Sequence, residues 1–264
     1  MIKWQRARFQ PNLPLGENGQ KVTASKEHRE LSKNAAKEGM VLLKNMNHVL
    51  PLPKGAKVAL FGKGTFDYVK GGGGSGDVTV EYVTNLYDGM KALKERVTVF
   101  EELADFYREN VKEQYAKGAV PGLTVEPEVP HELLVKAKAF TDTAIISISR
   151  FSGEGWDRKS TFDKKNIDLS DFGALQAKKA EEIFENGDFY LTKKEIEMVN
   201  IVKENFDKVI VVMNVGGMVD TEWFVNDDAI QSVLMAWQGG MEGGRAAAEL
   251  LCGIGNPSGK LSDT

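Results

Sequence analysis

The chain has 264 residues, 42% of them hydrophobic and 27% charged, so it can bury a full core and lies near the upper limit for one domain. Its formal net charge of -4 gives no electrostatic reason to expect nucleic acid as a partner. No apolar run approaches the roughly 20 residues that span a membrane. The amino terminus also lacks an apolar segment of signal-peptide length, so we expect a cytoplasmic protein unless a secretion signal has been removed.

The residues that commonly bind metals are scarce and scattered. The single cysteine, Cys252, cannot form a disulfide within the chain, and His28, His48 and His131 lie far apart in the sequence. We therefore expect no metal centre, and nothing in the composition calls for a cofactor.

The chain begins with an arm that proline and glycine interrupt. We assign residues 1–24 to this arm and residues 25–264 to one domain. Ser25 can cap the first helix of the domain, and apolar side chains at near-helical spacing predict that this helix continues through Leu42 and Leu43.

Strands and helices alternate through the rest of the chain. Strands are predicted for residues 57–61, 97–100, 144–148, 209–213 and 232–237. Helices are predicted for residues 85–96, 103–116, 131–139, 175–184, 192–205 and 245–252. This alternation predicts an α/β fold with a mostly parallel sheet and helices on both faces. About five or six β/α units are too few for an eight-fold barrel.

Two glycine-rich segments follow the first of these strands. Gly62-x-Gly64 begins a dinucleotide fingerprint, but Asp67 stands where its third glycine should be. Residues 71–77 are the most glycine-dense segment, and no Lys-Ser or Lys-Thr follows them as a P-loop requires. A nucleotide site is therefore the weakest hypothesis. A mobile hairpin-like loop and a loop that borders a cleft both fit the segment.

A loop after the strand at residues 144–148 is the candidate for chemistry, because Gly153 and Gly155 bracket Glu154 there. Glycines let a ligand approach closely, and open α/β sheets bind ligands at the carboxyl ends of their strands. Beside the ring of Trp156, burial can raise the pKa of Glu154, as a general acid near neutral pH requires. A solvated glutamate on a flexible loop is the alternative interpretation.

The neighbouring residues have less specific roles. Trp156 is either a platform for a sugar ring or a lid packed on a core, while Asp157 and Arg158 are expected to hold the loop in shape through a salt bridge. Glu242, among glycines before the last helix, is a second candidate carboxylate. A position near a helix start favours an acidic side chain on electrostatic grounds, so we expect Glu242 to be structural.

Four segments together resemble the α/β sandwich domain of the family 3 glycoside hydrolases, which include many bacterial and fungal β-glucosidases. They are residues 35–45 with 50–52, residues 57–62 with 72–76, residues 152–158, and residues 240–244 through 255–261. Each segment alone is weak, but all occur in the family's order between about Ala35 and Thr264. The resemblance implies an (α/β)6-sandwich-like fold.

The resemblance also implies that Glu154 is the general acid/base of a retaining, β-glucosidase-like hydrolase of terminal β-linked sugars. Trp156, Ser75 and Asp77 would then contact the substrate, a β-glucoside or oligosaccharide. The family's nucleophile is an aspartate on a separate (β/α)8 barrel, and no Ser-Asp-Trp motif or barrel-length repeat occurs in this chain.

The chain would thus hold half of an active site, with a barrel domain of the same polypeptide as its partner, and alone it is expected to be inactive. We expect a member in which the sandwich domain precedes the barrel. The alternative is a non-catalytic carbohydrate-binding or interdomain module, which the missing nucleophile favours.

Overall fold

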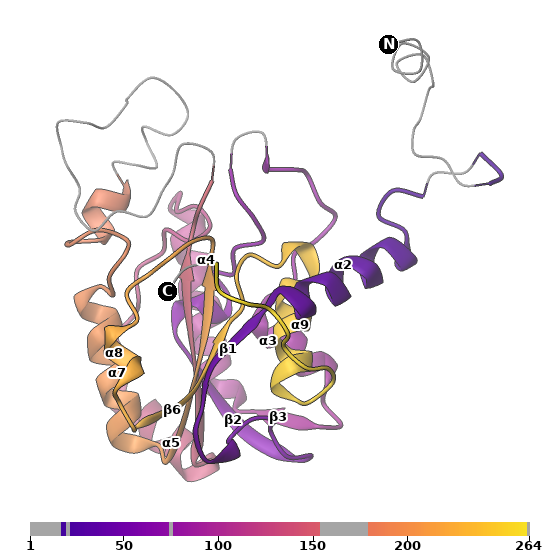
Figure 1. Cartoon of the computed structure of the whole chain (residues 1–264). Coiled ribbons are helices and arrows are strands. Elements are labelled where there is room, and N and C mark those ends of the chain that lie inside the picture. The colour runs from indigo at the N-terminus through magenta and orange to yellow at the C-terminus, as the bar shows by residue number, and fades with distance from the viewer. Residues whose placement is uncertain (1–16, 20–21, 74–75, 154–178, 263–264) are drawn as a thin grey trace.

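The computed structural model describes residues 17–19, 22–73, 76–153 and 179–262, and Figure 1 shows a central sheet with helices on either side. The six-stranded sheet has the order β1-β6-β5-β4-β2-β3. Within these ranges no helix is long and apolar enough to cross a membrane.

The strands are β1 Val41–Asn45, β2 Ala56–Phe61, β3 Val97–Val99, β4 Thr143–Arg150, β5 Lys208–Val215 and β6 Ile230–Met235. Neighbouring strands pair in parallel, except that β1 is antiparallel to β6. The predicted mostly parallel sheet is therefore confirmed.

The helices are α2 Lys26–Gly39, α3 Leu86–Ala92, α4 Glu101–Ala116, α5 His131–Phe140, α7 Lys193–Asn205, α8 Glu222–Val225 and α9 Gly243–Leu251. Short 3-10 turns lie at η1 Met46–His48, η2 Lys63–Thr65 and η4 Gly240–Glu242. Helix α7 begins with the capping box that the sequence predicts, because the Thr192 hydroxyl accepts from the Glu195 amide and the Glu195 carboxylate accepts from the Thr192 amide.

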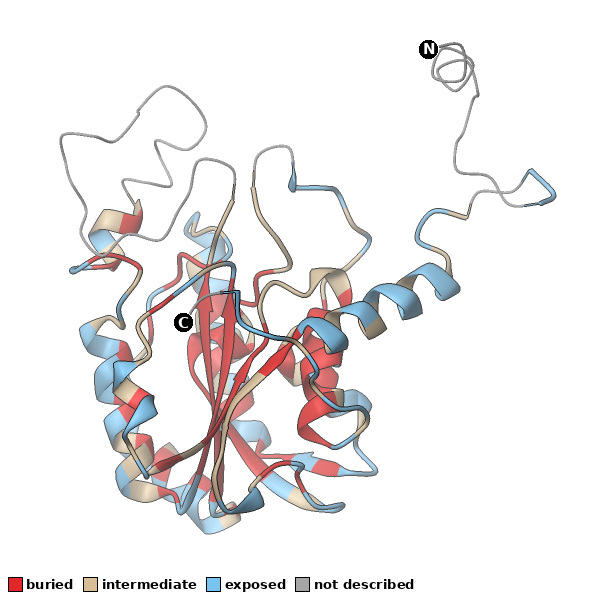
Figure 2. Ribbon diagram, viewed as in Figure 1, coloured by how far each residue is buried: buried red, intermediate tan, exposed pale blue. Residues whose placement is uncertain are grey.

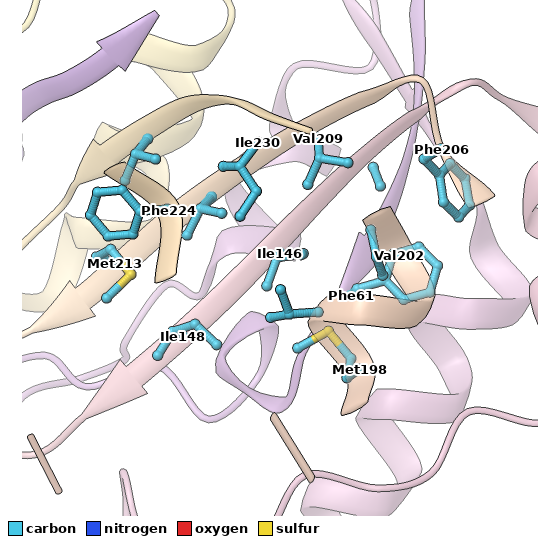
Figure 3. Close-up of a cluster of buried hydrophobic side chains, with 14 of the residues drawn as sticks. Phe61, Ile146, Ile148, Met198, Val202, Phe206, Val209, Met213, Phe224 and Ile230 are labelled. Atoms are coloured by element: carbon cyan, nitrogen blue, oxygen red, sulfur yellow. The ribbon is translucent and has the colours of Figure 1, made fainter. Parts of the chain in front are cut away.

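Two hydrophobic cores lie on the opposite faces of the sheet, because successive side chains of a strand point to opposite sides. Along β5, Val209, Val211 and Met213 belong to the first core, while Ile210 and Val212 belong to the second. Helices α4, α5, α7 and α8 contribute to the first core, part of which Figure 3 shows, and α3 and α9 to the second. Figure 2 shows the resulting buried sheet between helices with exposed outer faces.

The prediction that the first helix continues through Leu42 and Leu43 is wrong. Helix α2 ends at Gly39, and residues Val41–Asn45 form the edge strand β1. Leu42 packs against the second core and Leu43 against the first. This alternation has the period of a strand, and pairing with β6 supplies the backbone hydrogen bonds that a longer helix would have made.

The chain that follows α9 returns to the end of α2. The backbone N–H of Gly259 donates to the carbonyl of Met40 at 3.0 Å, and the Ser258 hydroxyl donates to the carbonyl of Glu38 at 3.3 Å. A Cβ on Gly259 would overlap the carbonyl oxygen of Gly39, so only glycine allows this close approach. The start of β1 and the chain that follows α9 are therefore in direct contact.

The order of the strands places a topological switch point between β2 and β4. From β2 the chain moves outward to β3, and from β4 it moves in the opposite direction to β5 and β6. Open α/β sheets bind ligands outside the carboxyl ends of the strands at such a point. The segments that leave these two ends are the glycine-rich segment after β2 and the loop toward Glu154 after β4.

Candidate functional site

The loop after β4 lies against the glycine-rich segment that follows β2. A Cβ on Gly153 would overlap the backbone nitrogen of Gly73, and a Cβ on Gly72 would lie 3.0 Å from the carbonyl oxygen of Ser152. Side chains at these glycines would force the two loops apart. The two segments that the sequence singles out thus meet at the switch point, through backbone contacts that need glycine.

Two further loops complete the surroundings of residues 151–153, which we call the loop root. A Cβ on Gly122, which follows α4, would lie 2.7 Å from the Cβ of Phe151. After β5, a Cβ on Gly216 would overlap the Cβ of Ser152. The Gln238 amide, after β6, donates to the Ser152 carbonyl at 3.5 Å. The loop root is therefore packed against chain from several strand ends.

Most residues that the sequence proposes for the site lie outside the described ranges, namely Glu154, Trp156, Asp157, Arg158 and Ser75. Their roles stay predictions. Asp77 is described and exposed, and its carboxylate accepts from Lys70 Nζ at 2.7 Å. Lys70 also donates to the carbonyl of Val78, so this pair braces the glycine-rich segment. Substrate binding by Asp77 likewise stays a prediction.

Arg150, the last residue of β4, is a buried cation directly before the loop root. The side chain is 1% exposed. Its Nη1 and Nη2 atoms donate to the two carboxylate oxygens of Glu195 at 2.8 and 2.6 Å. Burial alone would raise the pKa of the Glu195 carboxyl, but the Arg150 guanidinium holds that pKa below its ordinary value. The Glu195 carboxyl is therefore ionised at neutral pH in the folded protein.

A second buried ion pair lies after β2. Lys63 and Asp67 are 2% and 0% exposed, and Lys63 Nζ is 3.3 Å from Asp67 Oδ2. Asp67 also accepts from the Tyr115 hydroxyl and the Gly122 amide, both at 2.6 Å, and from the Thr124 hydroxyl at 2.5 Å. The residue that replaces the third glycine of the dinucleotide fingerprint thus fixes the loop that supports Phe151.

Glu126 is a buried carboxyl beside these pairs. It is 2% exposed and accepts from the Lys63 amide at 2.8 Å and from the Tyr107 hydroxyl at 2.9 Å. Burial raises the pKa of Glu126 to about 7, and the nearby charge of Glu195 contributes to the increase. Glu126 therefore titrates near neutral pH, unlike an exposed glutamate.

We expect this pKa to make the domain less stable as pH rises from 4.5 to 8. Between its ordinary pKa of 4.5 and about 7, Glu126 keeps a proton in the folded state that the unfolded chain has released. Ionisation should cost the parent about 3 kcal/mol of unfolding free energy across this interval, and Glu126→Gln should not incur that loss. Urea unfolding at both pH values measures the difference. Parallel pH dependences of the two proteins would contradict the expectation.

Asn214 connects the glycine-rich segment to the end of β6. This side chain is fully buried near the carboxyl end of β5, where its Oδ1 accepts from the Val69 amide at 2.7 Å. Its Nδ2 donates to the carbonyls of Val69 at 3.0 Å and of Trp237 at 2.7 Å. Trp237 has a φ of 51°, an uncommon conformation for a bulky residue, which this hydrogen bond helps to hold.

The other candidate carboxylate, Glu242, belongs to a separate cluster. It is 3% exposed, accepts from the Tyr82 hydroxyl, and lies 3.3 Å from Arg245 Nη1. The Arg29 guanidinium lies 5.7 Å from the centroid of the Tyr82 ring. These partners give Glu242 a structural role, in line with the expectation from the sequence.

Arg150, Lys63, Asn214 and Glu126 carry no role that was predicted from the sequence. A signal existed for Arg150 and Asn214, since each is a polar residue within or at the end of an apolar strand that leads to the ligand side of a parallel sheet. No local signal marks Glu126, because it lies in a proline-punctuated loop where burial cannot be read from periodicity.

The fold and this edge of the sheet define an open α/β domain that presents two glycine-flanked loops at its switch point. The model of the glycosyl hydrolase family 3 C-terminal domain matches residues 40–264. The chain belongs to this family, which confirms the resemblance seen in the sequence.

The chain is similar to several β-glucosidases along nearly its whole length. It is 59% identical over 264 residues to beta-glucosidase A of Butyrivibrio fibrisolvens, covering 100% of this chain and 32% of that protein. The structure of a β-glucosidase from Paenibacillus barengoltzii has 35% identity and a TM-score of 0.73, over 90% of this chain and 24% of that one. Beta-glucosidase 3B of Thermotoga neapolitana, solved with α-D-glucose, has 33% identity and a TM-score of 0.70, over 89% and 30%. This chain thus spans a third or less of their lengths.

Proposed function

We propose that this domain supplies Glu154 as the general acid/base of a retaining, β-glucosidase-like hydrolase that acts on terminal β-linked sugars. The position of Glu154 carries the proposal. It follows directly on Gly153, whose backbone packs against Gly73 at the switch point, where open α/β sheets bind ligands. Membership of the family and the similarity to β-glucosidases support the same assignment.

In a retaining mechanism the carboxylic acid first protonates the leaving oxygen, and the resulting carboxylate then activates the water that releases the sugar. The nucleophile must lie about 5 to 5.5 Å from the acid/base. We propose that an aspartate on a (β/α)8 barrel of the same polypeptide provides it, so that the isolated chain is inactive. Trp156, Ser75 and Asp77 would contact the sugar, and Asp157 with Arg158 would hold the loop.

The described surroundings suit this role because an acid must be held in place to act on a leaving oxygen. The loop root contacts chain that follows β2, α4, β5 and β6. Arg150, in its buried pair with Glu195, directly precedes the loop root, and Asp67, in its pair with Lys63, binds the Gly122 amide next to Phe151. Rigid support of this kind is more than a solvated loop glutamate would require.

The test is Glu154→Ala in the intact protein that contains this chain. Hydrolysis of cellobiose, whose leaving group needs protonation, should fall by about 10²- to 10⁴-fold in kcat/KM. A 2,4-dinitrophenyl β-glucoside should lose far less in kcat/KM, because its leaving group departs without a proton. Azide should restore turnover of the activated substrate, since this anion attacks the glycosyl-enzyme without a general base.

Glu128→Ala is the matched control, because Glu128 is an exposed glutamate on the loop after α4. It should behave as the parent does on both substrates. If Glu154→Ala also hydrolysed both at the parent's rate, the assignment would be wrong. The alternative of a non-catalytic carbohydrate-binding or interdomain module would then be favoured.

A further inference from the structure

We infer that Arg150, through its ion pair with Glu195, is the positioning residue for the acid/base step. The Arg150 side chain binds Asp188, Tyr190 and Glu195, which follow Glu154 in the sequence, while Arg150 itself precedes it. These bonds fix the direction in which the loop root leaves β4. This inference rests on the proposed role of Glu154, and it assigns to Arg150 no contact with the substrate.

The hydrogen bonds of Arg150 account for every donor that a guanidinium has. The bonds to Glu195 use one N–H each of Nη1 and Nη2. The remaining N–H groups donate to backbone carbonyls: Nε to Asp188 at 3.1 Å, Nη1 to Ser149 at 2.9 Å and Nη2 to Tyr190 at 2.9 Å. An arginine has five such N–H groups, all in one plane, so its orientation is fully determined.

Apart from the neighbouring Ser149, the partners of Arg150 lie in the part of the chain that follows the segment containing Glu154. Asp188, Tyr190 and Glu195 all follow the segment, whereas Arg150 precedes Glu154 by four positions. The Phe184 ring, also in this part of the chain, lies 4.7 Å from the guanidinium carbon. The Arg150 side chain therefore connects the end of β4 to residues 188–195, which follow the segment containing Glu154. The loop root follows Arg150 directly and is held by the glycine contacts.

Glu195 connects the Arg150 side chain to the first turn of helix α7. Its Oε2 accepts from the backbone N–H of Thr192 as part of the capping box of α7, while both oxygens accept from Arg150. Helix α7 packs on the first core through Met198 and Val202. Parallel hydrogen bonds between a guanidinium and a carboxylate specify direction as well as distance. The end of β4 is thus oriented by the first turn of α7.

A positioning role predicts a specific kinetic defect. Misplacement of a catalytic group by about 1 Å can cost about 10²-fold in rate while the protein stays folded. The loss should concentrate in steps that need a proton from, or to, Glu154. Lysine at position 150 keeps the charge but presents its donors from one point, so it cannot reproduce the planar set of hydrogen bonds.

The experiment compares Arg150→Lys and Glu195→Asp with the parent, in the intact protein. For cellobiose, kcat/KM should fall by about 10²-fold. For 2,4-dinitrophenyl β-glucoside, kcat/KM should stay near the parent value, while kcat and KM fall together because the glycosyl-enzyme accumulates when water is poorly activated. Arg108→Lys, at a partly exposed arginine on α4, is the matched control. It should leave the kinetic constants for both substrates at the parent values.

A merely structural role would lower the activity on both substrates by the same factor with KM unchanged, and that result would overturn the inference. Since a broken buried pair can unfold the protein, Arg150→Met/Glu195→Leu provides a second test. Apolar replacement of a buried pair is often tolerated. If this variant folded and kept the parent's rate on cellobiose, Arg150 would not position the acid. Lack of a leaving-group effect in Glu154→Ala would instead overturn the proposed function.

Discussion

Gly244→Ala is expected to destabilise the domain by about 3 kcal/mol or more, because the helices on the second face cross at this residue. A Cβ on Gly244 would overlap the carbonyl group of Asn85 and lie 2.6 Å from the carbonyl oxygen of Thr84. On the facing helix, a Cβ on Gly89 would overlap the carbonyl oxygen of Gly244. These neighbours are backbone atoms, so relief requires α3 and α9 to move apart.

Urea unfolding of Gly244→Ala and of Gly39→Ala measures this effect. Gly39 is the last residue of α2, and a Cβ there would meet nothing within 4 Å. Alanine should therefore stabilise the domain at this position by about 0.5 to 1 kcal/mol, since glycine is the less favourable helical residue. Similar unfolding midpoints for the two variants would show that the close crossing of α3 and α9 is not required.

Asp67→Ala is expected to cost about 3 to 5 kcal/mol, because it removes the counter-charge of a buried ammonium group. Lys63 is 2% exposed, and its Nζ lies 3.3 Å from the Asp67 carboxylate. The same substitution leaves the Gly122 amide and the hydroxyls of Tyr115 and Thr124 without their acceptor. We therefore expect the loop after α4 to lose its attachment to the loop root along with the ion pair.

The control is Asp77→Ala, which breaks another lysine–aspartate pair of the same region. The Asp77 side chain is 64% exposed, and its contact with Lys70 at 2.7 Å faces solvent. Pairs of this kind contribute about 0 to 1 kcal/mol. The loss of unfolding free energy relative to the parent, measured by urea titration, should be several-fold larger for Asp67→Ala than for Asp77→Ala. Equal losses would mean that burial does not set the strength of these pairs.

The sequence alone predicts most of the regular elements. The apolar run that forms β4 is itself rich in β-branched isoleucine, and Thr192 with Glu195 marks the start of α7. These signals are local, so tertiary contacts need not be known. The edge strand β1 was not predicted because Leu42 and Leu43 fit the spacing of a helix as well as that of a strand. The strand forms because these residues pair with β6, which is distant in the sequence.

The site is predictable to a lesser degree. The glycine-rich segment and the loop toward Glu154 were singled out from their glycines, and the strand order explains why they meet. The contacts behind them join residues far apart in the chain, such as Arg150 to Glu195 and Asp67 to Gly122. Sequence patterns report local periodicity and do not indicate which buried charges find each other across such separations.

The contact between Gly259 and Met40 also bears on how this domain is carried in a longer polypeptide. The ion pairs of Lys33 and Lys37 with Glu249, both at 2.6 Å, fasten α2 to α9 beside that contact. A domain whose entry and exit touch can be inserted at different places in a larger chain with changes only in the linkers. Since Val41 pairs with Met235 at the carboxyl end of β6, this contact lies at the same edge of the sheet as the loop root, so linkers attached there would leave the domain on the side of the proposed site.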